Sequence, residues 1–86
     1  MNPYSVIIQP YVTEKGVRLV EDENKIVFIV RRGADKEDIR KAVELLYNVK
    51  VAEVNTLIDA KGKKRAYVKL QEGYSAEDIA MQVGVF

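Results

Sequence analysis

One apolar run, Lys25-Ile-Val-Phe-Ile-Val-Arg31, constrains the fold of this 86-residue chain more than any other feature. β-Branched and aromatic residues follow one another there, without the polar alternation of a half-exposed strand. Such a run is typical of a strand that is buried on both faces. A chain of this length has room for one domain with one small core, so residues 1–86 are expected to pack as a single unit around this strand.

A short helix is predicted before the central strand. Thr13 suits an N-cap and Glu14 lies in the positive first turn, so the helix is expected to run to about Glu21, with residues 21–24 as a polar turn. Gly16 weakens such a helix by about 1 kcal/mol relative to alanine, which indicates that packing or a partner holds it in place.

Two further helices are predicted from capping residues. Asp35 and Asp38 form a capping pair ahead of an amphipathic helix over residues 36–47. Ser75 and Asp78 form a similar pair ahead of a last helix near the carboxyl end of the sequence.

A β-hairpin is predicted between these two helices. Residues 51–58 alternate, with Ala52, Val54, Thr56 and Ile58 on one face and Glu53, Asn55 and Leu57 on the other. Residues 65–71 alternate as well, with Ala66, Val68 and Leu70 inward, and residues 59–62 have the composition of a hairpin turn. This order of elements predicts an α+β fold in which helices pack against a sheet.

The composition excludes much catalytic chemistry. The chain has no cysteine and no histidine, so it lacks disulfides, thiolate metal ligands and imidazole acid–base groups. It also lacks a glycine-rich phosphate loop and any stretch long enough to span a bilayer. The acidic run Glu21-Asp-Glu23 fits a solvated turn better than a weak Mg²⁺ site. We therefore expect a cytosolic protein that is not an enzyme and needs no cofactor.

Positive charge is concentrated in one segment. The net charge is only +1, which is less than the strongly basic footprint of a typical nucleic-acid-binding domain. No acidic residue interrupts the basic segment, whose cations are Lys61, Lys63, Lys64, Arg65 and Lys69. These side chains suit phosphate contacts, although lysines at a hairpin tip also serve solubility alone.

Other polar residues have two interpretations each. Tyr67 shares a strand face with Lys69 and is placed to stack on a base, or it packs across the sheet. Arg31 and Arg32 suit phosphate contacts, or they pair with nearby acids. The amide in Asn55-Thr56 offers donors and acceptors to RNA, or it makes a structural hydrogen bond.

Two phrases of the sequence resemble a known family. They are Pro10-Tyr-Val-Thr-Glu-Lys15, and Val54-Asn-Thr56 followed by Lys61-Gly-Lys-Lys-Arg65 and Ala66-Tyr-Val-Lys-Leu70. Together they resemble the family of large-subunit ribosomal protein twenty-three, which lies at the rim of the polypeptide exit tunnel. The short turn from Asp59 to Lys64 and the ending Gly84-Val-Phe86 resemble its archaeal branch. Bacterial members carry a longer loop that reaches into the tunnel, so this chain is expected to rim the tunnel without lining it.

The resemblance implies a ferredoxin-like αβ-plait, with a four-stranded antiparallel sheet to which residues 5–9 add a strand. It also implies a structural role in the large ribosomal subunit, in the cytoplasm, with no membrane partner. The expected RNA-binding residues are Thr13, Lys15, Lys25, Arg31, Arg32, Asn55, Thr56, Lys61, Lys63, Lys64, Arg65, Tyr67 and Lys69.

The partners implied by the resemblance are large-subunit ribosomal RNA, neighbouring ribosomal proteins, and the signal recognition particle or a nascent-chain chaperone. The signal recognition particle or the chaperone is expected to dock at Val12 and Glu14. The free protein is expected to be a monomer. The alternative is a small regulatory or protein-interaction domain that does not bind RNA.

Overall fold

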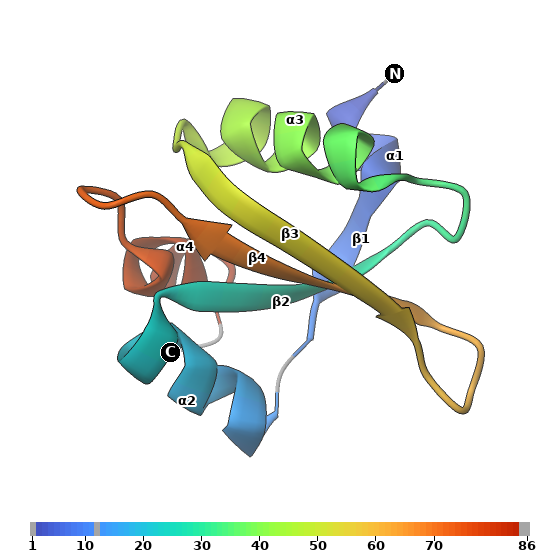
Figure 1. The fold of residues 1–86 in the computed structure, drawn as a ribbon, viewed down its shortest axis with the longest axis horizontal. Coiled ribbons are helices and arrows are strands. Elements are labelled where there is room, and N and C mark those ends of the chain that lie inside the picture. The colour runs from blue at the N-terminus through green and yellow to red at the C-terminus, as the bar shows by residue number, and fades with distance from the viewer. Residues whose placement is uncertain (1, 12, 85–86) are drawn as a thin grey trace.

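A computed structural model describes residues 2–11 and 13–84, and it has the predicted α+β fold (Figure 1). A four-stranded antiparallel sheet has the strand order β1-β2-β4-β3. The elements are α1 (Pro3–Val6), β1 (Ile7–Pro10), α2 (Glu14–Glu23), β2 (Lys25–Val30), α3 (Lys36–Tyr47), β3 (Val51–Ile58), β4 (Lys64–Leu70) and α4 (Ala76–Gln82). Within the described ranges, every helix is too short or too polar to cross a bilayer.

The strand β2 is buried on both faces, as its sequence predicts. It pairs with β1 on one side and β4 on the other, and every side chain from Ile26 to Val30 is at most 5% exposed. Burying a side chain of this kind stabilises the fold by roughly 1.5–3 kcal/mol. The strand therefore supplies apolar surface to both sides of the sheet.

One face of the sheet carries the main core. Phe28 is fully buried there, and its ring stacks on Tyr47 of α3 with the centroids 5.8 Å apart. Buried side chains of α1, α3 and α4 pack on the same cluster, which Val20 of α2 also joins. Figure 1 shows α1 beside α3, and α2 beside α4, on opposite sides of the strands in this view.

The second face of the sheet is more polar than the core face. Neighbouring residues of a strand point to opposite faces, so the residues between the core positions lie here. Cross-strand pairing places Val27, Tyr67 and Asn55 in one row and Ile29, Arg65 and Leu57 in the next. The first turns of α2 lie over one end of this face. We call this surface the polar face.

The amino-terminal segment differs from the prediction. A strand was expected from Ser5 to Gln9, but the chain forms the short helix α1 first, and β1 begins only at Ile7. The Asn2 side chain accepts a hydrogen bond from the Tyr4 amide at 2.9 Å, and Pro3 occupies the first helical turn. A proline preset for this position and a side-chain cap favour the helical turn over an extended chain.

The end of α2 differs as well. The helix continues to Glu23, so the predicted turn over residues 21–24 is reduced to Asn24 in the left-handed conformation, with φ of 56°. The Asn24 side chain donates to the Tyr74 carbonyl at 2.8 Å and accepts from the Ala76 amide at 2.7 Å. This contact replaces the predicted cap of α4, because Ser75 makes no side-chain capping bond.

The remaining elements follow the prediction closely. The capping box of Asp35 and Asp38 forms, and α3 covers residues 36–47. In β3 the prediction that Ala52 shares a face with Val54, Thr56 and Ile58 was wrong, whereas Ile58 does share that face although it is exposed. A bulge between Val51 and Glu53 turns Ala52 outward, and Ile58 lies at the end of the hairpin.

Asn24 offers a direct test of this packing. Because glycine keeps the left-handed backbone but loses both side-chain hydrogen bonds, Asn24→Gly should lower the free energy of unfolding by about 1–3 kcal/mol. The measurement is urea unfolding followed by circular dichroism. Asn48→Gly is the matched control, since Asn48 also has positive φ, at 54°, and ends α3. Equal losses in the two variants would contradict a bridging role for the Asn24 side chain.

Candidate RNA interface

Asp59 organises the tip of the β3–β4 hairpin. One of its carboxylate oxygens accepts the backbone N–H groups of Lys61 at 2.9 Å and Lys63 at 3.0 Å. Its other oxygen accepts from Arg65 Nε at 3.3 Å. Gly62 takes φ of 83°, a conformation that suits glycine. The turn is thus held from inside while the side chains of Lys61 and Lys63 remain exposed.

These bonds change the pKa of the Asp59 carboxyl. Burial raises that pKa, but the backbone N–H groups of Lys63 and Lys61 and the charge of Arg65 outweigh this effect, so the pKa lies below its ordinary value of 3.8. Asp59 is therefore ionised at neutral pH. On the other side of the pair, contact with Tyr67, together with the charge of Asp59, raises the pKa of the Arg65 guanidinium.

Arg65 links the hairpin to the segment before α2. Its guanidinium lies over the ring of Tyr11, 4.2 Å from the centroid. Such a cation–π contact adds about 0.5–1 kcal/mol at a partly exposed site. Tyr11 was missed in the sequence interpretation, although it lies in the same phrase as Thr13 and Lys15 and is the aromatic residue nearest to them.

A hollow of about 220 Å³ lies beside this contact, between the first turns of α2 and β4. It gathers four of the predicted RNA-binding residues: Thr13, Lys15, Arg65 and Tyr67. Val27 and Leu19 give the hollow an apolar lining. We call it the α2–β4 hollow; it joins two phrases that are far apart in the sequence.

Gly16 explains how α2 can lie so close to the preceding segment. A Cβ atom at this position would lie 3.2 Å from the Tyr11 carbonyl oxygen and 3.3 Å from Thr13 Oγ1, tighter than most such contacts. The Thr13 hydroxyl accepts the Gly16 N–H at 3.0 Å, as expected of the N-cap. Packing therefore offsets the low helix propensity of Gly16.

Two of the cations that were predicted to bind RNA make polar contacts within the protein. Lys64 Nζ donates to the carbonyl of Ala34 at 2.6 Å and to that of Arg32 at 3.3 Å. Lys64 pairs with Val30 in the sheet, so it points away from the polar face. Lys25 lies 3.3 Å from Glu23. Their contact with RNA remains a prediction, but the bonds of Lys64 are structural.

Asn55 and Thr56 lie on opposite faces of the sheet. Asn55 is exposed and pairs with Tyr67 on the polar face, whereas Thr56 pairs with Ala66 on the core face and is half-buried. Lys69 is exposed on the polar face beyond Tyr67. Only Asn55 of the Asn-Thr pair can therefore share one binding surface with Tyr67 and Lys69.

Arg31 and Arg32 follow β2 and are exposed. Among the described residues, neither arginine forms an ion pair with an acidic side chain. The nearby Glu37 pairs with Arg40 instead. That bond lowers the pKa of Glu37. Arg32 lines a second hollow, of about 320 Å³, together with Lys63 and the exposed Ile8.

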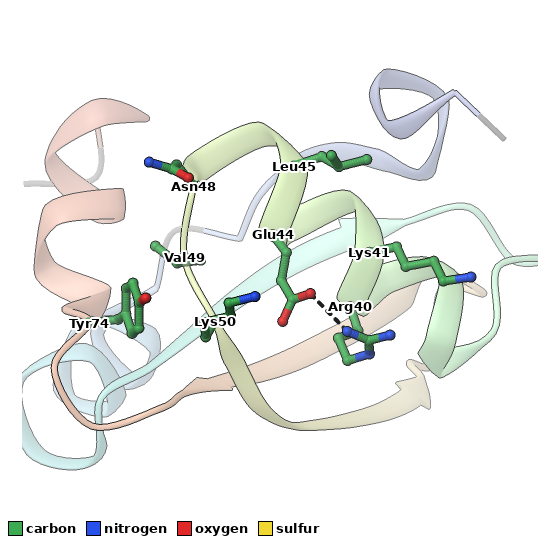
Figure 2. A pocket seen from close by; sticks show the side chains of 8 residues that line it. All are labelled: Arg40, Lys41, Glu44, Leu45, Asn48, Val49, Lys50 and Tyr74. Carbon is green, nitrogen blue, oxygen red and sulfur yellow. Dashed lines mark hydrogen bonds and ion pairs between the residues drawn. The ribbon is translucent and has the colours of Figure 1, made fainter.

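A larger hollow, of about 430 Å³, lies away from these residues (Figure 2). Asn48 and Tyr74 lie toward one end of it and Lys41 toward the other. The Glu44 carboxylate accepts hydrogen bonds from Arg40 Nη1 at 2.8 Å and from the Val51 N–H at 2.9 Å. It therefore links α3 to β3. This hollow contains none of the predicted contact residues.

Comparison with known proteins identifies the family of the chain. Residues 5–66 match the model of the family described as Ribosomal protein L23. The chain belongs to the ribosomal protein L23 family. The large ribosomal subunit protein uL23 of Methanothermobacter thermautotrophicus is 49% identical, and that of Methanococcus vannielii is 48% identical. Each alignment covers 86 residues and the full length of both chains.

Membership in the L23 family makes the chain an archaeal-type structural component of the large ribosomal subunit, with a role in translation on the cytoplasmic ribosome. The family is one of ribosomal structural proteins and is not known as a family of enzymes. The predicted family and its archaeal type are therefore confirmed.

The lowered pKa of Asp59 predicts how the hairpin tip responds to acid. The ionised carboxylate stabilises the tip above its ordinary pKa of 3.8, and this contribution is lost as the pH falls through the lower pKa of the folded state. We expect the amide ¹H shifts of Lys61 and Lys63 to titrate with a midpoint below 3.8. The measurement is an NMR pH titration, with Asp59→Asn as the control in which this transition disappears. A midpoint at or above 3.8 would refute the hydrogen-bond network.

Proposed function

We propose that the polar face and the hairpin tip bind large-subunit ribosomal RNA and so fix the protein near the exit of the polypeptide tunnel. One observation carries this proposal: the fold brings Lys15, Arg65, Tyr67 and Lys69 to one face although two distant phrases supply them. Exposed Lys61 and Lys63 extend the face at the hairpin tip.

The chemistry of this surface suits structured RNA. Flexible lysines neutralise phosphates and release counterions, which gives affinity without sequence preference. Tyrosine rings and a fixed guanidinium provide planes for stacking, and the exposed amide of Asn55 adds donors and acceptors. The mechanism is positional: the protein binds folded RNA and undergoes no turnover.

Family membership and the short hairpin support the proposed position near the tunnel. Asp59 closes the turn tightly through the backbone at Lys61 and Lys63. Since so short a tip has little reach, we propose that this protein lies at the rim of the tunnel without lining its wall.

A salt series tests the RNA proposal. Binding to large-subunit ribosomal RNA fragments should be tighter than binding to unrelated structured RNA and should weaken steeply as salt rises. The variant Lys61→Ala/Lys63→Ala should lower the log–log salt slope by about two, since each phosphate contact contributes about one. The control is Lys36→Ala/Lys41→Ala, which removes the same charge from α3, where both lysines are exposed.

Three results would argue against RNA binding at this face: no preference for ribosomal fragments, no dependence on salt, or equal effects of the two double variants. Any of them would favour the alternative of a protein-interaction domain whose lysines serve solubility.

We also propose that Glu14 is a docking residue for a nascent-chain factor, the signal recognition particle or a chaperone. Its side chain is 88% exposed at the first turn of α2, and its nearest cation, Arg18, is 3.9 Å away and also exposed. Such an exposed pair contributes little to stability, so the charge of Glu14 is free for a partner. Val12, the other predicted docking residue, lies outside the described residues.

Charge reversal tests this docking proposal. Large subunits that carry Glu14→Arg should bind purified archaeal signal recognition particle about tenfold more weakly, a loss of ~1.4 kcal/mol. The measurement is co-sedimentation, after confirming normal incorporation of the variant protein. Asp22→Arg, which reverses an exposed charge in the last turn of the same helix, is the control. Unchanged binding of Glu14→Arg subunits would contradict docking at this residue.

A further inference from the structure

We propose that the α2–β4 hollow receives a single unstacked nucleobase of the bound RNA, so that the protein recognises an extruded nucleotide as well as phosphate charge. This inference rests on the proposed RNA binding and adds the chemical class of ligand that enters one defined site.

The size of the hollow supports one base. At about 220 Å³ it is smaller than the roughly 300–1,000 Å³ of sites that enclose drug-sized ligands. Its lining comes from the segment before α2, the first turns of α2, and single positions of β2 and β4. A single planar ring with an attached backbone suits this volume better than a folded peptide segment does.

The walls of the hollow offer planar surfaces. Tyr11 and Tyr67 contribute aromatic rings, and the planar Arg65 guanidinium lies over the Tyr11 ring, 4.2 Å from its centroid. Proteins that recognise unpaired RNA bases stack them on aromatic rings and on arginine planes. Buried Val27, which is 3% exposed, adds an apolar surface below.

The charges at the hollow favour a neutral ring inside and a phosphate outside. The charge of Arg65 is already balanced by Asp59, whose oxygen lies 3.3 Å from its Nε atom. Lys15 also lines the hollow and is exposed, and no ion pair to it is found among the described residues. Because Arg65 is already paired, Lys15 is the cation available for the phosphate attached to a bound base.

The hollow is also preformed. Asp59 fixes Arg65 from the hairpin, and the Thr13 hydroxyl holds the first turn of α2 through the Gly16 N–H at 3.0 Å. The aromatic and guanidinium planes therefore lose little conformational freedom when a base enters, which is the condition under which stacking contributes most to affinity.

Mononucleotides provide the first test. The probes are the 5′-monophosphates of adenosine, guanosine, cytidine and uridine, with ribose 5-phosphate as the control that lacks a base. Added at millimolar concentration to the ¹⁵N-labelled full chain, at least one nucleotide should give saturable shifts in the amides of Lys15, Gly16, Val27 and Tyr67. Ribose 5-phosphate should leave Val27 and Tyr67 unchanged. Equal shifts with ribose 5-phosphate, or no shifts at these residues with any nucleotide, would overturn the proposal.

A set of tyrosine variants provides the second test, with ribosomal RNA fragments. Tyr67→Ala should weaken binding about tenfold without changing the salt slope, because it removes stacking and leaves the phosphate contacts intact. Tyr67→Phe keeps the ring and should bind like the unsubstituted protein. Tyr74→Ala, at an exposed aromatic away from this face, is the matched control and should also bind normally.

The two proposals fail in different ways. If the unsubstituted protein shows no preference for ribosomal fragments, RNA binding itself is wrong. If it binds them with the expected salt dependence but Tyr67→Ala binds equally well, the surface contacts only the RNA backbone and the nucleobase site is refuted.

Discussion

The antiparallel pairing of β2 with β4 is the interaction on which the rest of the structure depends. It places Ile26 and Phe28 over the main core and presents Val27 to the opposite face, so one strand supplies apolar surface to both. The same pairing brings Tyr67 and Arg65 beside Val27, where they form the polar face. A slip of the register by one residue would move every side chain of a strand to the opposite face of the sheet. Tyr67 and Arg65 would then no longer lie beside α2.

The basic segment contains cations with partners inside the protein and cations that are exposed. Lys64 and Arg65 are held by the protein itself, the first by backbone carbonyls and the second by Asp59 and Tyr11. Lys61 and Lys63 project freely from the tip that these contacts stabilise. A partly buried cation with fixed partners gives geometry, whereas an exposed lysine gives charge that is sensitive to salt. Within the basic segment, Lys64 and Arg65 are therefore structural, and Lys61 and Lys63 form the proposed phosphate-binding surface.

Local signals predicted the elements well where the decisive contacts were themselves local. The capping box of Asp35 and Asp38 lies within one turn, so the start of α3 could be placed from sequence. The cap of α4 could not, because it comes from Asn24, which is far away in the chain and meets Ala76 only through the tertiary fold. The bulge that exposes Ala52 escaped prediction for a similar reason: strand periodicity assumes regular pairing, and irregular pairing depends on the partner strand.

The sequence by itself determined that β2 is buried on both faces, that the fold is α+β, and that the chain belongs to the L23 family, because these properties follow from local patterns and shared motifs. Only the tertiary structure decided which predicted contact residues form one surface. It joined Lys15 to Tyr67 in one hollow, separated Asn55 from Thr56, and assigned Lys64 to the carbonyl of Ala34. The physical reason is that strand register and helix packing set the direction of each side chain, and both arise from contacts between distant parts of the chain.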